Sequence, residues 1–182
     1  LGYGNQEVIA TATEQMNKLT FNHMFGGKTH QVAIDLADKL ASMIPMDDAV
    51  ISFGNSGSDA NDTHIKLLRY YHEAIGKPER RKIIARDRSY HGVTVAAASL
   101  TGLPVTQNHF DLPVDALGIL RTDHPHYYRG KQGNETETEF IDRIVGNLEK
   151  MILKEGPETI AAFIAEPITG ASGVIVPPEG YY

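Results

Sequence analysis

The stretch AVISFGNSGSDAND, residues 49–62, begins with an apolar run, continues with a turn of small residues and leads into a helical pattern. The run AVISF predicts a buried strand, so the turn is expected to connect a strand to a helix. Gly57 allows backbone angles that other residues avoid, and small side chains leave amide N–H groups open to an anion at the helix start. Ser56, Gly57 and Ser58 therefore predict a phosphate site, although either serine could instead only cap the helix.

Apolar runs and helical periods alternate along the rest of the chain. Helices are predicted at about 5–19, 29–44, 59–75, 93–100 and 135–155. Strands are predicted at 49–53, 82–85 and 159–165, with a short one near 118–121 and a further candidate at 174–176. Strands that alternate with helices predict an α/β fold with a mostly parallel sheet.

Composition excludes several classes of function. The chain has 182 residues, a formal charge of −6 and no cysteine, so neither a nucleic-acid-binding surface nor a disulfide scaffold is expected. We expect no membrane span, and a cytoplasmic protein is the default. His124-Pro125-His126 resembles a metal pair, but no acidic or cysteine cluster completes it, so no metal site is expected. The first residue, Leu1, and the ending PPEGYY suggest a piece of a longer protein.

Three predicted strands are each followed by a loop with polar residues. GNSGS follows the first, SYHG with Tyr90 follows the second, and EPITGASG with Glu166 follows the third. Ligands of open α/β sheets bind beyond the carboxyl ends of the strands. Tyr90 could pack over its own loop and Glu166 could be a solvated acid. Together with the phosphate site, however, they predict a flat cofactor that carries a single phosphate.

The segments NSGSDANDTHIKLLRYYH, SYHGVTVAAASLTGLP, TDHPHYYRG and IAAFIAEPITGASGVIVPPEGYY are collinear with one family. They resemble the large domain of class III aminotransferases, pyridoxal-phosphate enzymes of the ω-transaminase type. The resemblance covers essentially the whole chain. It implies fold type I, a three-layer α/β/α domain like that of aspartate aminotransferase, here incomplete. It also implies an N-terminal helix and connection at 1–28 and the start of the cofactor-binding domain at 29–182.

The resemblance assigns roles to individual positions. The glutamate of the family's E-P-x-x-G loop falls on Glu166, and we expect it to bond near Ser58. The phosphate cup falls on Ser56, Gly57 and Ser58, the ring-stacking aromatic on Tyr90 with His91 beside it, and the substrate pocket on Phe25 and Ala171.

The family's catalytic lysine, which binds the cofactor covalently, has no matching motif among residues 1–182 and is expected beyond the chain. The resemblance implies a homodimer in which pyridoxal phosphate carries an amino group from an amine or ω-amino acid to a keto acid such as pyruvate. The 182 residues alone are expected to be inactive. Three alternatives stay open: an aminomutase, a decarboxylase of the same fold, and a non-catalytic fragment that binds a phosphorylated ligand.

Overall fold

The computed structural model describes residues 2–182. The chain forms two compact units, one ending at Phe53 and the other running from Gly54 to Tyr182. The predicted boundary at 28/29, between the N-terminal segment and the cofactor-binding domain, stays a prediction. The second unit contains Ser56–Ser58, Tyr90, His91 and Glu166, so most of the predicted site belongs to one compact body.

The first unit consists of two helices and their connections. Helix α1 (Gln6–Lys18) begins where the Asn5 side chain accepts a hydrogen bond from the Val8 amide, and α2 (Gln31–Ala41) is capped in the same way by His30. Both helices were predicted, although α2 is shorter at each end than expected. The predicted strand at 49–53 is wrong. A strand needs a neighbour for its N–H and C=O groups, and these residues pair with none among those described.

The second unit is built on a sheet of three parallel strands in the order β2-β1-β3. Its strands are β1 (Lys82–Arg86), β2 (Ile119–Thr122) and β3 (Ile160–Ile164), and its helices are α3 (Gly57–Ala74), α4 (Val95–Leu100), α5 (Tyr127–Gly130) and α6 (Glu137–Glu155). Short 3₁₀ turns occur at Pro104–Thr106, Asp115–Leu117 and Pro157–Thr159. The predicted strand at 174–176 is wrong, because only a single bridge forms there, between Thr169 and Ile175.

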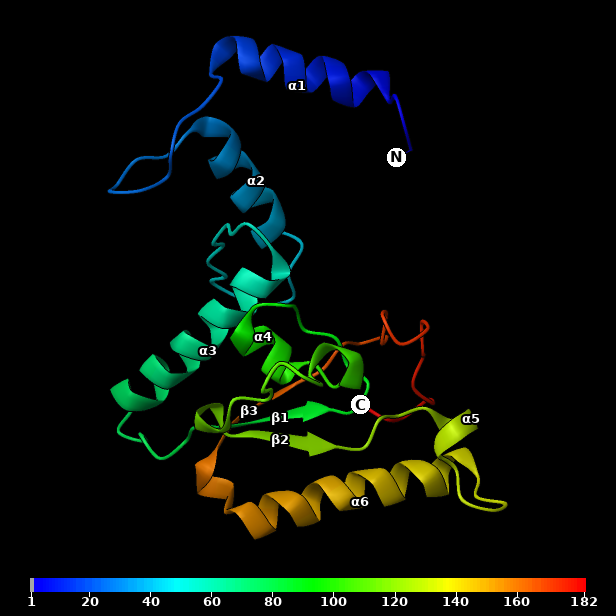
Figure 1. The fold of residues 1–182 in the computed structure, drawn as a ribbon. Coiled ribbons are helices and arrows are strands. Elements are labelled where there is room, and N and C mark those ends of the chain that lie inside the picture. Colours follow the sequence, from blue (N-terminus) through cyan, green and yellow to red (C-terminus); the bar gives the residue numbers. More distant parts are fainter. Residues whose placement is uncertain (1) are drawn as a thin grey trace. The chain divides into compact units, whose positions relative to one another are not determined.

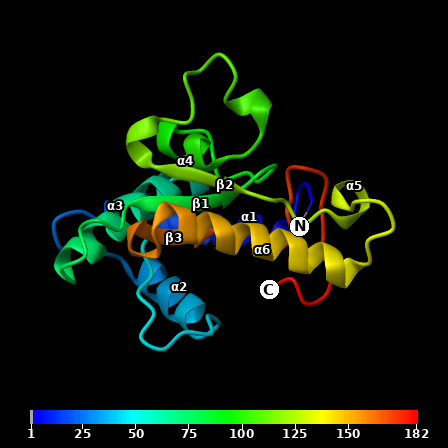
Figure 2. The ribbon, with the colours of Figure 1, turned by 90° about the horizontal axis from the view of Figure 1, so that it is seen from below.

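Helices cover both faces of this sheet. Figure 1 shows α3 and α4 on one side of the strands and α6 on the other, and in Figure 2 α6 runs across the sheet. β1 is buried on both faces, with Ile84 only 1% exposed, as expected for the central strand of a covered parallel sheet. The predicted three-layer α/β/α arrangement is therefore confirmed in this unit.

The apolar core joins the helices α3 and α4 to the sheet. Ile65 of α3, Ile83 of β1 and Leu100 of α4 form its buried centre. Partly buried neighbours pack against that centre: Leu68, Ala96, Leu117, Ile119, Ala161 and Ile164. Because this packing fixes α3 and α4 against the sheet, it sets the frame for the site.

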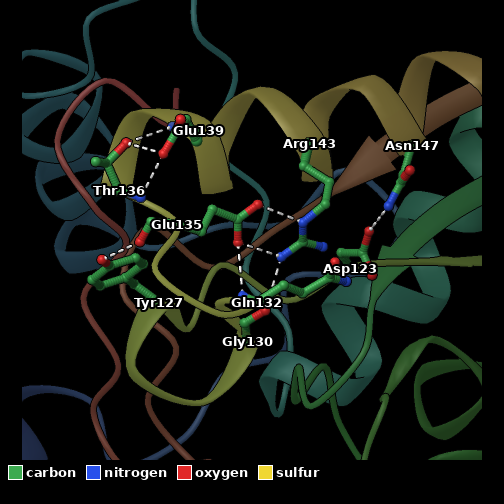
Figure 3. Close-up of polar contacts among 9 residues, drawn as sticks. All are labelled: Asp123, Tyr127, Gly130, Gln132, Glu135, Thr136, Glu139, Arg143 and Asn147. Carbon is green, nitrogen blue, oxygen red and sulfur yellow. Dashed lines mark hydrogen bonds and ion pairs between the residues drawn. The ribbon is translucent and has the colours of Figure 1, made fainter.

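Polar contacts at the start of α6 hold the chain that follows β2 (Figure 3). Thr136 and Glu139 form a capping box, in which each side chain accepts from the other residue's amide. Arg143 forms a two-point ion pair with Glu135, at 2.7 and 2.9 Å, and also donates to the Gly130 carbonyl. These contacts anchor the loop that leads from the carboxyl end of β2 to α6.

Candidate functional site

The loop that leaves β1 at its carboxyl end meets both the loop after β3 and the start of α3. Parallel strands present these ends at one edge of the sheet, so residues far apart in sequence converge there. Tyr90 and His91 follow β1, and Glu166 follows β3. The start of α3 joins them through the Ser58 hydroxyl, which accepts a 3.0 Å hydrogen bond from the Val93 amide.

The first turn of α3 is open to a ligand. The Ser56 side chain accepts from the Asp59 amide at 3.1 Å, so Ser56 is the cap that was considered as an alternative. The cap leaves two donors over, because the amides of Gly57 and Ser58 have no hydrogen-bond acceptor anywhere in residues 2–182. Gly57 is exposed, and a Cβ placed there would meet nothing within 4 Å. A cap and two free donors therefore coexist in one turn, and phosphate binding there stays a prediction.

Gly92 permits the close approach of the Tyr90 loop to α3. A Cβ at Gly92 would lie 2.5 Å from Ser58 Oγ and 2.9 Å from Ser58 Cα, and its φ of 131° is a conformation that other residues rarely adopt. The backbone of the loop thus lies directly on the first turn of α3.

Glu166 clamps two loops through its carboxylate. One oxygen accepts from the Tyr90 amide and the other from the Gly170 amide, both at 2.9 Å. The expected bond between Glu166 and the Ser58 region is therefore wrong. β3 lies beside β1, so Glu166 reaches the loop after β1, while the Ser58 hydroxyl is already bonded to Val93.

Tyr90 is held by its backbone and presents its ring. Its side chain is 38% exposed, although its amide is fixed by Glu166. His91, next in the chain, is 7% exposed, and its amide donates to the Thr101 hydroxyl at 2.9 Å. Its Nε2 is buried without a hydrogen-bond partner in the described part of the chain. One side chain of the pair is therefore turned outward and the other is enclosed.

Ala171 and Phe25, the two predicted pocket residues, lie in different units. Ala171 is exposed in a turn that the bridge between Thr169 and Ile175 closes, and it directly follows the clamped Gly170. Phe25 is 83% exposed in the first unit. Their role as substrate-pocket residues stays a prediction.

Arg86, at the end of β1, is a residue that the sequence analysis missed. It is fully buried and donates to the Tyr182 hydroxyl and to the Glu166 carbonyl. Its guanidinium also lies over the Tyr181 ring, 5.8 Å from the centroid. A charged residue that ends an apolar strand was the available signal, because a buried arginine needs several acceptors. Arg86 thereby fixes the backbone of the Glu166 loop.

His124 is the second residue that was missed as a neighbour of the site. Its Nε2 lies 3.2 Å from the Thr169 hydroxyl, which links the loop after β2 to the loop after β3. No group of three or more histidines and acids is placed to hold a metal ion in residues 2–182. The His124–Thr169 contact connects the two loops.

Burial of the two histidines gives the fold a testable pH dependence. Desolvation lowers the pKa of His91 to about 4, and desolvation together with nearby Arg86 lowers the pKa of His124 to about 4, from 6.5. Between about pH 6.5 and 4 these two histidines bind protons in the unfolded chain but stay neutral in the folded chain. Stability should therefore fall as the pH falls through this window. Melting temperatures measured across it should depend less on pH in the His91→Gln/His124→Gln variant, and an unchanged slope would contradict the assignment.

Comparison with known proteins identifies the class. The family model described as aminotransferase class-III matches residues 1–182. Probable gamma-aminobutyrate transaminase 3, mitochondrial, from Oryza sativa subsp. indica is 51% identical over 183 residues, which cover 100% of this chain and 36% of that protein. The omega transaminase from Pseudomonas jessenii, solved in complex with PMP, has a TM-score of 0.95 at 51% identity, covering 100% of this chain and 40% of the other. A structure described as a transaminase with L-ala has a TM-score of 0.94 at 52% identity. The match covers 99% of this chain and 42% of the other.

The chain therefore belongs to the class-III aminotransferase family. The predicted family and the predicted fold, the large domain of fold type I, are confirmed. The chain spans 36% of the length of the rice relative. Within residues 2–182, none of the helices has the length and apolar character that a membrane span requires.

Proposed function

We propose that the protein is a pyridoxal-phosphate-dependent transaminase that moves an amino group from an amine or ω-amino acid to a keto acid such as pyruvate. The observation that carries the proposal is the pair of unpartnered amides at Gly57 and Ser58, beside a loop that presents Tyr90. The relatives support the choice of substrates, since one is named for gamma-aminobutyrate and another was solved with L-ala.

The residues present fit pyridoxal phosphate. A phosphate needs N–H donors, and the two free amides lie at the positive end of the long helix α3. A planar ring needs a flat apolar surface, and Tyr90, which is 38% exposed, carries an aromatic ring of that kind. Bound there, the cofactor would supply an electron-withdrawing ring and a reactive aldehyde.

The chain's own residues would hold and orient this group. The amides of Gly57 and Ser58 would bind the phosphate, and Tyr90 would lie against the ring. Glu166 would keep Tyr90 in place by accepting a hydrogen bond from its amide, and the same carboxylate would hold Gly170 beside Ala171. Orientation of this kind increases the reaction rate, because the reacting atoms are already held in the reactive geometry.

We also propose that none of the chain's lysines serves as the catalytic lysine. Lys82 supports this view, since it pairs at 2.9 Å with Glu155 at the amino end of β1, the end of the sheet opposite the site. Lys18 pairs with Glu14 on α1, and Lys131 lies over the Tyr127 ring. Borohydride trapping in the full-length protein followed by peptide mapping is the measurement, and a trapped lysine within residues 1–182 would refute this part.

Two further proposals follow from the family. We propose a homodimer, which light scattering of the active full-length protein tests directly; a strictly monomeric active enzyme would refute it. A cytoplasmic location stays a prediction, and the name of the rice relative places that protein in mitochondria.

Replacing Tyr90 with alanine tests the site within the full-length protein. We expect cofactor affinity to fall by about fivefold, because an aromatic contact is worth about 1 kcal/mol beyond the area it buries. The measurements are a titration of the cofactor-free protein with pyridoxal phosphate and a transamination assay with gamma-aminobutyrate and pyruvate. A wild-type protein that neither binds the cofactor nor transaminates would refute the proposed function. Unchanged affinity in the Tyr90→Ala variant would refute only the stacking role.

A further inference from the structure

Asp62 caps a helix to which it does not belong. At an ordinary helix start, the capping residue's side chain accepts from the amide three positions on. At the start of α4 the cap residue is Thr94, yet its hydroxyl donates to Asp62 at 2.8 Å. The same carboxylate oxygen of Asp62 accepts from the Ala97 amide at 3.0 Å. A residue of α3 thus does the work that Thr94 would otherwise do for α4.

The neighbouring residues of α3 hold the same segment. Asn61 donates from its side-chain amide to the His91 carbonyl at 2.6 Å, and the Ser58 hydroxyl accepts from Val93. Residues 91–97 are therefore bonded at successive points to the first turns of α3. All of these bonds join positions about thirty residues or more apart in sequence.

These contacts tie together the two halves of the cofactor site. The start of α3 carries the free amides of Gly57 and Ser58, and the segment that it grips begins directly after Tyr90. The distance from phosphate donors to aromatic ring is therefore set by how α3 holds this segment. Asp62 and Asn61 are side chains of α3 that grip it without belonging to the predicted phosphate cup.

We propose that Asp62, with Asn61 beside it, is a positioning residue that fixes Tyr90 relative to the phosphate donors. The proposal rests on the proposed function, since it concerns the placement of that cofactor. The phosphate is joined to the rigid ring by a short arm, so phosphate and ring can be met only within a narrow range of separations. Asp62 sets this separation through Thr94 and Ala97, and Asn61 sets it through the His91 carbonyl.

The test uses the full-length protein, freed of cofactor and titrated with pyridoxal phosphate. We expect Asp62→Ala to weaken cofactor binding by about tenfold, because the segment after Tyr90 loses two of its hydrogen bonds to α3. The visible circular dichroism of the bound cofactor should also decrease, because it reports how the ring is held. Asp62→Asn keeps an oxygen at the same place and should restore affinity to within about threefold of wild type.

A double-mutant cycle separates positioning from general damage. Thr94→Val removes the hydroxyl that Asp62 binds, so it should weaken cofactor binding in the wild type and add little in the Asp62→Ala variant. Glu73→Ala, a change at an exposed residue near the other end of α3, should leave affinity and dichroism unchanged.

The outcomes distinguish this inference from the proposed function. If the wild type does not bind pyridoxal phosphate, the proposed function fails first. If the wild type binds and Asp62→Ala has unchanged affinity and dichroism, the positioning role is refuted. Equal losses in Asp62→Asn and Asp62→Ala would refute it too, as would additive effects in the cycle. If Asp62→Ala does not fold, Asp62→Asn and Thr94→Val still decide the question.

Discussion

Gly92→Ala should abolish cofactor binding and destabilise the second unit by about 3 kcal/mol or more, through overpacking and backbone strain together. The added Cβ would lie 2.5 Å from Ser58 Oγ, 2.8 Å from Ala97 Cβ and 2.9 Å from Ser58 Cα. The Ser58 backbone cannot rotate away as a long side chain would. The Tyr90 loop must therefore leave α3, and the hydrogen bond from Val93 to Ser58 must break. Chemical denaturation and a titration with pyridoxal phosphate measure the two effects.

Gly146→Ala is the matched control for this change. Gly146 lies within α6, and a Cβ there would meet nothing within 4 Å. The same substitution should stabilise the protein by roughly 0.5–1 kcal/mol, because glycine is a poor helix former. A Gly92→Ala variant as stable as wild type, and with unchanged cofactor affinity, would show that the loop does not lie on α3.

Glu166→Gln should weaken binding of pyridoxal phosphate by about thirtyfold, equivalent to about 2 kcal/mol. Both carboxylate oxygens of Glu166 accept from backbone amides, one from Tyr90 and one from Gly170. Glutamine has the same shape but only one accepting oxygen, so its NH₂ group must face an amide that is also a donor. Either Tyr90 or Gly170 then loses its anchor. Affinity is measured by titration of the cofactor-free, full-length protein.

The control for this variant is Glu149→Gln, at an exposed position of α6. It removes the same charge without removing an acceptor from a clamped loop. A comparable loss of affinity in both variants would mean that net charge, rather than the clamp, governs cofactor binding. Full affinity in Glu166→Gln would refute the clamp.

Much of the second unit could be predicted from local patterns. The strands at 82–85 and 159–165 and the long helix at 135–155 have strong apolar runs or periods, and all three form close to those bounds. The strand at 49–53 has an equally apolar run but does not form. Whether a run becomes a strand depends on a neighbour that supplies hydrogen bonds, and the composition of one segment does not contain that information.

The candidate site, too, could be predicted only in part. The residue types that form the site could be recognised, because small residues at a helix start and an acid after a strand have local signatures. Their connections could not be predicted, since a long-range pairing decides which amide Glu166 accepts. The order β2-β1-β3 brings the loop of β3 to the loop of β1, and it directs Glu166 to Tyr90. Asp62 and Arg86 were missed for the same reason, because their partners lie far away in sequence.

The central place of β1 in the sheet has a consequence for the growing polypeptide on the ribosome. β1 is made before both of its neighbours, since Ile83 pairs with Ile119 on one side and Ala162 on the other. At roughly 5–20 residues per second, the interval before β3 emerges lasts for seconds. Throughout that interval the edge of β1 that later pairs with β3 has unpaired backbone groups. Newly made chains are therefore most exposed to aggregation at the strand that later holds the loop of Tyr90.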